Sequence, residues 1–160
     1  MKNISEQIEE IYAHKAGRET TSRKCIADYW ETPNVAVNVK SNDIHKENFL
    51  PRLVSCRPVY DFLKDPNHQL KFIFVDYDAT EDLKIINESQ PIYIEELDWD
   101  CLSINCQGDG FIAMKKKCVK NPILRSKVDR ITWMSEFKTH YASYIQKEQI
   151  KLQRNLSYFS

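Results

Sequence analysis

The sequence predicts a single α/β domain over residues 1–160, with a mixed central β-sheet flanked by helices. Three observations lead to this prediction. Apolar residues recur at helical spacing at both ends of the chain, valines alternate near residue 37, and a nearly continuous apolar run fills residues 71–77. Hydrophobic residues make up 42% of the 160 residues, which is enough to bury one core.

A short amphipathic helix is predicted at residues 4–16. Its apolar residues recur at helical spacing and fall on one face, and Gly17 follows as a stop. Acidic residues decorate the helix, among them Glu9 and Glu10.

A β-hairpin is predicted at residues 26–41, with strands at 26–30 and 35–40 around a turn at 32–34. Three valines in the second strand alternate with other residues at a period of two, so the valines face one side of the sheet. Asn38 and Lys40 therefore share the opposite side.

The middle of the chain predicts a loop, a helix and the central strand. Residues 42–53 are polar and predict a loop. A helix follows at about 55–65, with Ser55 as its N-cap and Asp65-Pro66 as its stop. The apolar run at 71–77 predicts a strand buried on both faces.

The C-terminal third predicts a helical segment at about 126–158, formed by one long helix or by two consecutive ones. A capping-box-like start lies at Ser126, and apolar residues then keep helical spacing. Shorter strands between the central strand and this segment are predicted at 82–87, 92–96, 101–105 and 110–114.

Composition limits the function classes. The formal net charge is zero, which argues against a passive nucleic-acid coat but not against a DNA enzyme that balances carboxylates with a basic surface. No apolar run approaches a membrane span, and the N-terminus lacks the apolar region of a signal peptide, so we expect a cytoplasmic protein without a membrane partner. The five cysteines include no C-x-x-C pair, which favours reduced, buried thiols over a zinc site.

The predicted hairpin carries the residues with the clearest chemical potential. Asp28 lies on the first strand, and Asn38 and Lys40 lie on the second. Phosphodiester hydrolysis needs a divalent metal, and magnesium prefers carboxylate, phosphate and water oxygens. A neighbouring lysine can stabilise the negative charge that develops at the attacked phosphate. An aspartate and an x-Lys pair on one face of two strands supply these groups.

The sequence around the hairpin resembles type II restriction endonucleases of the PD-(D/E)XK superfamily. The segment NVKSNDIHKENFLPRLVSCRPVYDFLKD is similar to the stretch after the catalytic lysine in that family, where a polar loop leads through a Pro-x-Ile-Ile-Ser-like step into a helix. Further segments also resemble the family: the lead-in Gly17-Arg18 with IADYW, the strand FIFVDY and the element LDWDCLSINCQGDGFIAMK. The resemblance spans about residues 17–135.

This resemblance implies a restriction-endonuclease-like core and Mg²⁺-dependent cleavage of double-stranded DNA at a short, specific site. Asp28 would hold the metal, Asn38 would complete or support the metal site, and Lys40 would stabilise charge at phosphorus. A palindromic site mirrors two-fold protein symmetry, so a homodimer is expected. A restriction enzyme also implies a cognate DNA methyltransferase in the same system.

The chain departs from the family motif at two positions. Ala27 replaces the proline before the aspartate, and Asn38 replaces the second acidic residue. An amide oxygen is a weaker magnesium ligand than a carboxylate, so another acid is needed. The candidates are Glu9 and Glu10 on the first helix, and Glu31, Asp43 and Glu47.

The candidate DNA-binding residues are polar or basic residues that follow the hairpin or lie near residue 115. Arg52 occupies the Pro51-Arg52 step and could read guanine or, at least as readily, contact a phosphate. The other candidates are Ser41, Asn42, Lys46, Lys115 and Lys116. For the lysine cluster, a solvated surface is an equally good interpretation.

Two alternatives to the nuclease remain. A degenerate member of the family could bind specific DNA without cutting it, because Asn38 has replaced the acid. An interaction module could instead dock a partner through its long C-terminal helix, and a large exposed apolar stripe at 128–159 would be its sign. The four histidines are isolated and receive no catalytic role.

Overall fold

A central mixed sheet with the strand order β1–β2–β4–β5 carries the fold. The computed structural model describes residues 2–21, 26–46, 52–80, 82–105, 109–118 and 121–160. β2 and β4 run parallel, while β1, β5 and the short β6 pair antiparallel to their neighbours. The strands are β1 Tyr29–Thr32, β2 Val35–Asp43, β4 Gln69–Asp78, β5 Lys84–Glu88 and β6 Ile92–Tyr93. The predicted α/β class with a mixed sheet is confirmed.

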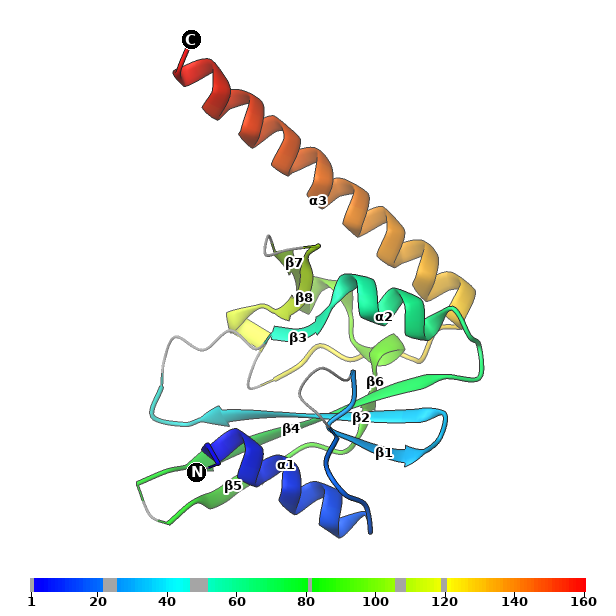
Figure 1. Cartoon of the computed structure of the whole chain (residues 1–160), viewed down its shortest axis with the longest axis vertical. Helices are drawn as coiled ribbons and strands as arrows, with labels where there is room; N and C mark the ends of the chain where they lie inside the picture. Colours follow the sequence, from blue (N-terminus) through cyan, green and yellow to red (C-terminus); the bar gives the residue numbers. More distant parts are fainter. Residues whose placement is uncertain (1, 22–25, 47–51, 81, 106–108, 119–120) are drawn as a thin grey trace.

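A second, smaller sheet is antiparallel, with the order β3–β8–β7. It lies with helix α2 on one side of the central sheet, while helix α1 lies on the other side (Figure 1). The chain passes from β2 through β3 and α2 before it returns as β4, because parallel neighbours need a crossover connection. The elements are β3 Arg52–Ser55, β7 Leu102–Asn105, β8 Phe111–Met114, α1 Ile4–Lys15 and α2 Cys56–Leu63, with short 3-10 turns at Ile94–Glu96, Trp99–Cys101 and Lys116–Cys118.

The alternation predicted for the second hairpin strand divides the core into two parts. Val37 and Val39 pack under α1 with Ile8 and Tyr12. Residues of the opposite parity, such as Ala36, face the larger core beneath α2 and the small sheet. Asn38 and Lys40 are therefore on the α2 side of the central strand β2.

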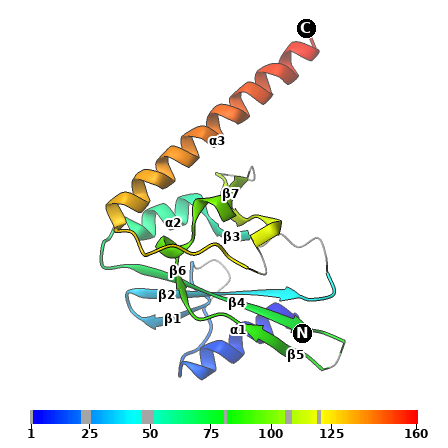
Figure 2. The same ribbon diagram turned by 180° about the vertical axis from the view of Figure 1, so that it is seen from behind.

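Helix α3, Arg130–Tyr158, is one continuous helix that packs on the body only at its N-terminal part. Trp133 and Phe137 are its buried residues, and the rest of the helix projects away from the sheets (Figures 1 and 2). The helix starts later than predicted because the side chain of Asp129, not Ser126, caps it by accepting a hydrogen bond from the Thr132 N–H at 2.7 Å.

Other predicted boundaries also differ from the structure. The first hairpin strand begins at Tyr29 rather than residue 26. The predicted loop at 42–53 is strand at both described ends, because pairing with β4 extends β2 to Asp43 and Arg52 already belongs to β3. The strand predicted at 92–96 ends after two residues in a 3-10 turn. Residues 47–51 lie outside the described residues.

The described cysteines are free and buried, namely Cys56, Cys101 and Cys118; Cys25 and Cys106 lie outside the described residues. None of the helices in the described ranges combines the length and the apolar character that a membrane crossing requires.

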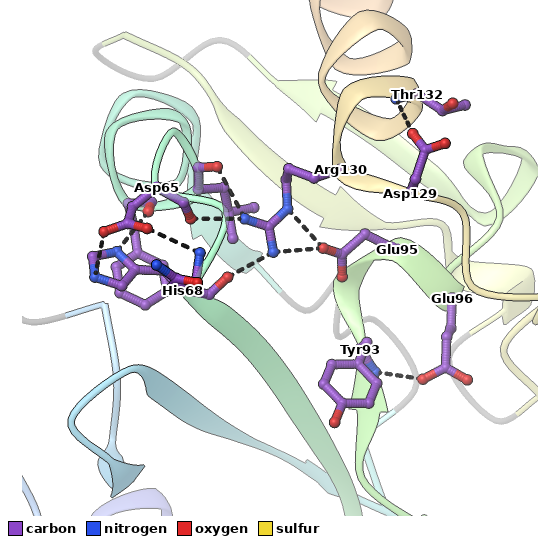
Figure 3. A network of polar contacts seen from close by, with 11 residues as sticks. Asp65, His68, Tyr93, Glu95, Glu96, Asp129, Arg130 and Thr132 are labelled. Carbon is purple, nitrogen blue, oxygen red and sulfur yellow. Dashed lines mark hydrogen bonds and ion pairs between the residues drawn. The ribbon is translucent and has the colours of Figure 1, made fainter.

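The first residue of α3 ties three segments together (Figure 3). The Arg130 guanidinium forms an ion pair with the buried Glu95 carboxylate at 2.9 Å. It also donates to the carbonyl oxygens of Leu63, Asp65 and His68, at distances of 2.6–3.1 Å. The end of α2, the turn after β6 and the start of α3 are thus held by one side chain.

We expect Arg130→Met to destabilise the fold by about 3–5 kcal/mol, because the substitution leaves the Glu95 charge buried without its partner. Urea unfolding measures this loss. Arg154→Met removes an exposed arginine from the same helix and serves as the control, with an expected change within about 0.5 kcal/mol. Equal losses in the two variants would contradict the anchoring role of Arg130.

Candidate functional site

A row of polar residues runs along one face of the central strand β2. Asn38, Lys40 and Asn42 alternate with the core residues Val37 and Val39, and both asparagines are buried. Buried polar groups cost free energy unless they are paired, so a central strand rarely carries such a row for stability alone. The row identifies β2 as the strand on which the candidate site is built.

Asp28 is fixed beside this row by backbone hydrogen bonds. Its N–H donates to the Val37 carbonyl at 2.9 Å, and its Oδ2 accepts from the Val39 N–H at 2.6 Å. Burial raises the pKa of the Asp28 carboxyl, while the Val39 hydrogen bond and the Lys40 charge oppose the rise. The geometry thus holds an acidic group against the strand that carries Lys40.

Lys40 lies among charges of both signs. Burial lowers the pKa of its ammonium group, because a desolvated cation is disfavoured. Asp28 and Glu9 act against this shift, and Arg52 adds to it. Lys40 is therefore the basic centre of a small group of interacting charges.

Glu9 is the second acid of this group, and it interacts with Asp28 and Lys40 from α1, which lies on the other side of the central sheet from α2 (Figure 1). The Ser5 hydroxyl of α1 lies 3.2 Å from the Ser41 hydroxyl, which places this part of the helix beside the end of β2. Glu9 lies one helical turn further along on the same side as Ser5. Burial and the Asp28 charge raise the pKa of Glu9 to about 7, and Lys40 opposes the rise.

The structure therefore separates Glu9 from the other candidate acids. Glu10 forms an ion pair with Lys2, and Glu31 forms one with Lys71 at 2.8 Å. Asp43 accepts a hydrogen bond from the His45 N–H at 3.0 Å. Glu47 lies outside the described residues. Glu9 alone of the four described candidates interacts electrostatically with both Asp28 and Lys40.

Asn38 lies on the same strand face as Lys40, as predicted, but its amide forms a hydrogen bond within the fold. Its Nδ2 donates to the Ile26 carbonyl at 3.0 Å, which holds the segment before Asp28. Its Oδ1 is buried and has no hydrogen-bond partner among the described residues. A buried acceptor without a partner is costly, so this oxygen is an unusual feature of the strand.

The predicted DNA-binding residues fall into two groups. The charge of Arg52 lowers the pKa of Lys40. The Arg52 guanidinium lies over the Phe111 ring, 4.3 Å from the ring centre, and donates a hydrogen bond to the Ser55 hydroxyl. Ser41 contacts α1, Asn42 donates to the Asp76 carboxylate at 3.3 Å, and the exposed Lys46 follows β2. These four lie along the end of β2 or beside Lys40.

Lys115 belongs to a different surface. It lines a hollow between β7 and α3, together with Trp99, His140 and Lys147. Lys116 lies in the following 3-10 turn, and its side chain is outside the described residues. The structure thus does not unite the lysine cluster with the residues around Lys40.

Sequence reasoning missed Asp76. This residue stands opposite Asn42 in the parallel register of β2 and β4, and so adds a carboxylate to the end of the polar row. The interruption of the apolar run FIFVDY by an aspartate was the available indication. Within the described ranges, no group of three or more His, Cys, Asp or Glu side chains is placed to hold a metal ion by itself.

No protein-family model matches the chain, and a search of characterised proteins gives no significant match. The function is therefore argued from the residues of the site.

The pKa of Glu9 predicts a pH-dependent stability. Between pH 4.5 and about 7 the folded state keeps the Glu9 proton while the unfolded chain has released it. The stabilising contribution is complete below pH 4.5 and is lost as the pH rises through about 7. We expect Glu9→Gln to gain about 1–2 kcal/mol over the wild type at pH 8 relative to pH 4, allowing for solvent screening of a half-buried group.

Urea unfolding at a series of pH values measures this difference. Glu10→Gln is the control, because Glu10 lies next in sequence but pairs with Lys2 instead of facing Asp28. A stability difference between Glu9→Gln and the wild type that stays constant with pH would show that Glu9 titrates normally.

Proposed function

We propose that the chain is a metal-dependent nuclease that hydrolyses phosphodiester bonds of double-stranded DNA, with Glu9, Asp28 and Lys40 as its site. The observation that carries this proposal is the electrostatic coupling of two carboxyls and one lysine across α1, the segment before β1, and β2. Raised carboxyl pKa values and a lowered lysine pKa in one cluster are typical of functional sites.

The donor set fits magnesium. Magnesium is usually held by one or two carboxylates, with water and substrate phosphate oxygens completing its shell. Glu9 and Asp28 supply two carboxylates, and the buried Asn38 Oδ1 supplies a neutral oxygen without a partner. In this proposal Glu9 supplies the acid that Asn38 lacks. When bound, the metal would neutralise the scissile phosphate and lower the pKa of the attacking water.

Lys40 has the role of stabilising charge. Hydrolysis forms a bond between the water oxygen and phosphorus, breaks the bond to the leaving deoxyribose oxygen, and returns a proton to that oxygen. Negative charge grows on the phosphoryl oxygens during attack, and an ammonium group in a desolvated position stabilises it more than one in water. Asp28 and Glu9 favour the charged form of this group and oppose the lowering of its pKa by burial.

Arg52 supports binding of the nucleic acid in the same proposal. Its guanidinium is exposed, lies near Lys40, and is oriented by the Phe111 ring and the Ser55 hydroxyl. An oriented guanidinium can bind a phosphate or the edge of a guanine. The resemblance to PD-(D/E)XK restriction endonucleases extends this proposal in two ways. The core would be restriction-endonuclease-like, and the DNA would be cut at a short, specific site.

Plasmid cleavage with magnesium, compared with EDTA, tests the proposal. We expect Asp28→Asn, Lys40→Met and Glu9→Gln each to lower the cleavage rate at least about 100-fold, because each removes a ligand or the charge-stabilising group. Glu10→Gln is the matched control and should keep the wild-type rate, since Glu10 pairs with Lys2. Cleavage that resists EDTA, or that survives Asp28→Asn, would refute the site.

A DNA-binding protein without catalytic activity is the second candidate, and one observation favours it. Asn38 stands at the second acidic position of the motif, and its amide already donates to Ile26. DNA binding that is retained in the wild type, without cleavage in magnesium or manganese, would support this candidate against the nuclease. Magnesium-dependent thermal stabilisation that is lost in Asp28→Asn would instead support an intact metal site.

A further inference from the structure

The projecting half of α3 carries an apolar stripe that no described element covers. Ile145, Leu152 and Leu156 are 37%, 63% and 67% exposed, and Phe159 at the end of the helix is 82% exposed. At 3.6 residues per turn, the first three fall within about 40° of one line along the helix. A stripe of this kind on a helix normally faces another packed surface.

The stripe continues from the part of α3 that packs on the body. The same helix side carries Tyr141 and then Phe137, which is buried. These two residues, with Ala142 and Lys138, line a cavity of about 490 Å³ that Cys56 and Tyr60 of α2 close from the other side. Cavity and stripe thus form one apolar track, which begins in the angle between α3 and the body and runs outward along the helix (Figure 1).

The polar border of the track favours another helix as its cover, because a helix can bury the apolar residues and leave the polar ones at the rim. Lys147 and Arg154 lie on the far side of α3, and Glu148, Gln149 and Gln153 border the stripe. The inner end of the track lies between α3 and α2, since residues of both helices line the cavity, and the body lies below the projecting helix (Figure 2). A flat membrane surface cannot follow this angle down to the cavity, whereas a helix end can enter it.

We propose that the occupant is α3 of a second copy of this chain, packed antiparallel on the stripe, with the Phe159 end of each copy in the α2–α3 cavity of the other. A two-fold axis near Leu152 would set Ile145 opposite the partner's Phe159, so the exposed aromatic end arrives beside the cavity that Tyr141 and Ala142 line. The same residues then serve both sides of the interface, as two-fold symmetry requires.

This inference does not depend on the nuclease proposal. It rests on α3 and the cavity, and none of Glu9, Asp28 and Lys40 lines that cavity. Failure of cleavage would leave it intact, and a monomeric protein would refute it without affecting the proposed site.

Sedimentation equilibrium of the full chain tests the interface. We expect a dimer whose dissociation constant rises at least about tenfold in Leu152→Asp, because the charge would be buried against an apolar partner. Ile150→Asp is the matched control: Ile150 is 59% exposed on the same stretch of helix, about 140° from the stripe, and its substitution should change the constant less than about twofold. A monomer at every concentration, or equal effects of the two variants, would overturn the proposal.

Disulfide trapping tests the antiparallel arrangement. When Ile145→Cys and Phe159→Cys chains are mixed and oxidised, we expect a crosslink between the two kinds of chain, with the wild type as the background control. Crosslinking of Phe159→Cys chains mainly to each other would indicate parallel helices and would overturn the arrangement. A monomer that binds vesicles of anionic phospholipid would assign the stripe to a membrane surface instead.

Discussion

The ion pair between Arg130 and Glu95 anchors helix α3 on the body of the molecule, because it links the first residue of α3 to the turn after β6. The side chains of Arg130 and Glu95 are 15% and 2% exposed. The guanidinium also donates hydrogen bonds to carbonyl oxygens at the end of α2 and in the turn before β4. A pair of this kind contributes little net stability by itself but is costly to break. Its contacts link the first residue of α3 to two other segments of the body, and the direction in which α3 leaves the body starts from this anchored residue.

A second constraint, the parallel pairing of β2 with β4, creates the face on which the candidate site stands. The register fixes nine residue pairs from Val35–Gln69 to Asp43–Tyr77. Because side chains alternate, this register directs Val37 and Val39 to α1 and directs Asn38 and Lys40 to the other side. A shift by one residue would exchange the two faces, so that Asn38 and Lys40 would face α1 and the valines would face away from it. The placement of the candidate site therefore depends on the same hydrogen bonds as the core.

The sequence predicted what local patterns determine. The first helix, the alternation at Val37 and Val39 and the central strand follow from periodicity, and the structure has each of them. The choice of Glu9 over Glu10 could not be predicted, because adjacent helix residues differ only in the direction they face once α1 is docked. The extension of β2 to Asp43 and the strand at Arg52 were missed for a related reason, since their pairing partners lie 34 and 61 residues away in the registers Asn42–Asp76 and Arg52–Ala113. The start of α3 was predicted at Ser126, but the residue that caps the helix is Asp129, three positions later.

During synthesis, the charged residues of the candidate site emerge before strand β4, which pairs with β2 in the folded protein. Glu9, Asp28 and Lys40 all lie within the first 40 residues, whereas β4 begins at Gln69. A growing chain that has not yet released β4 from the ribosome has every charged group of the site, yet its hairpin is an isolated two-stranded ribbon, which is only marginally stable in water. The carboxyls and the lysine of such a chain remain hydrated and keep ordinary acidities. The unusual electrostatics of Glu9, Asp28 and Lys40 therefore arise only after the crossover through β3 and α2 has closed.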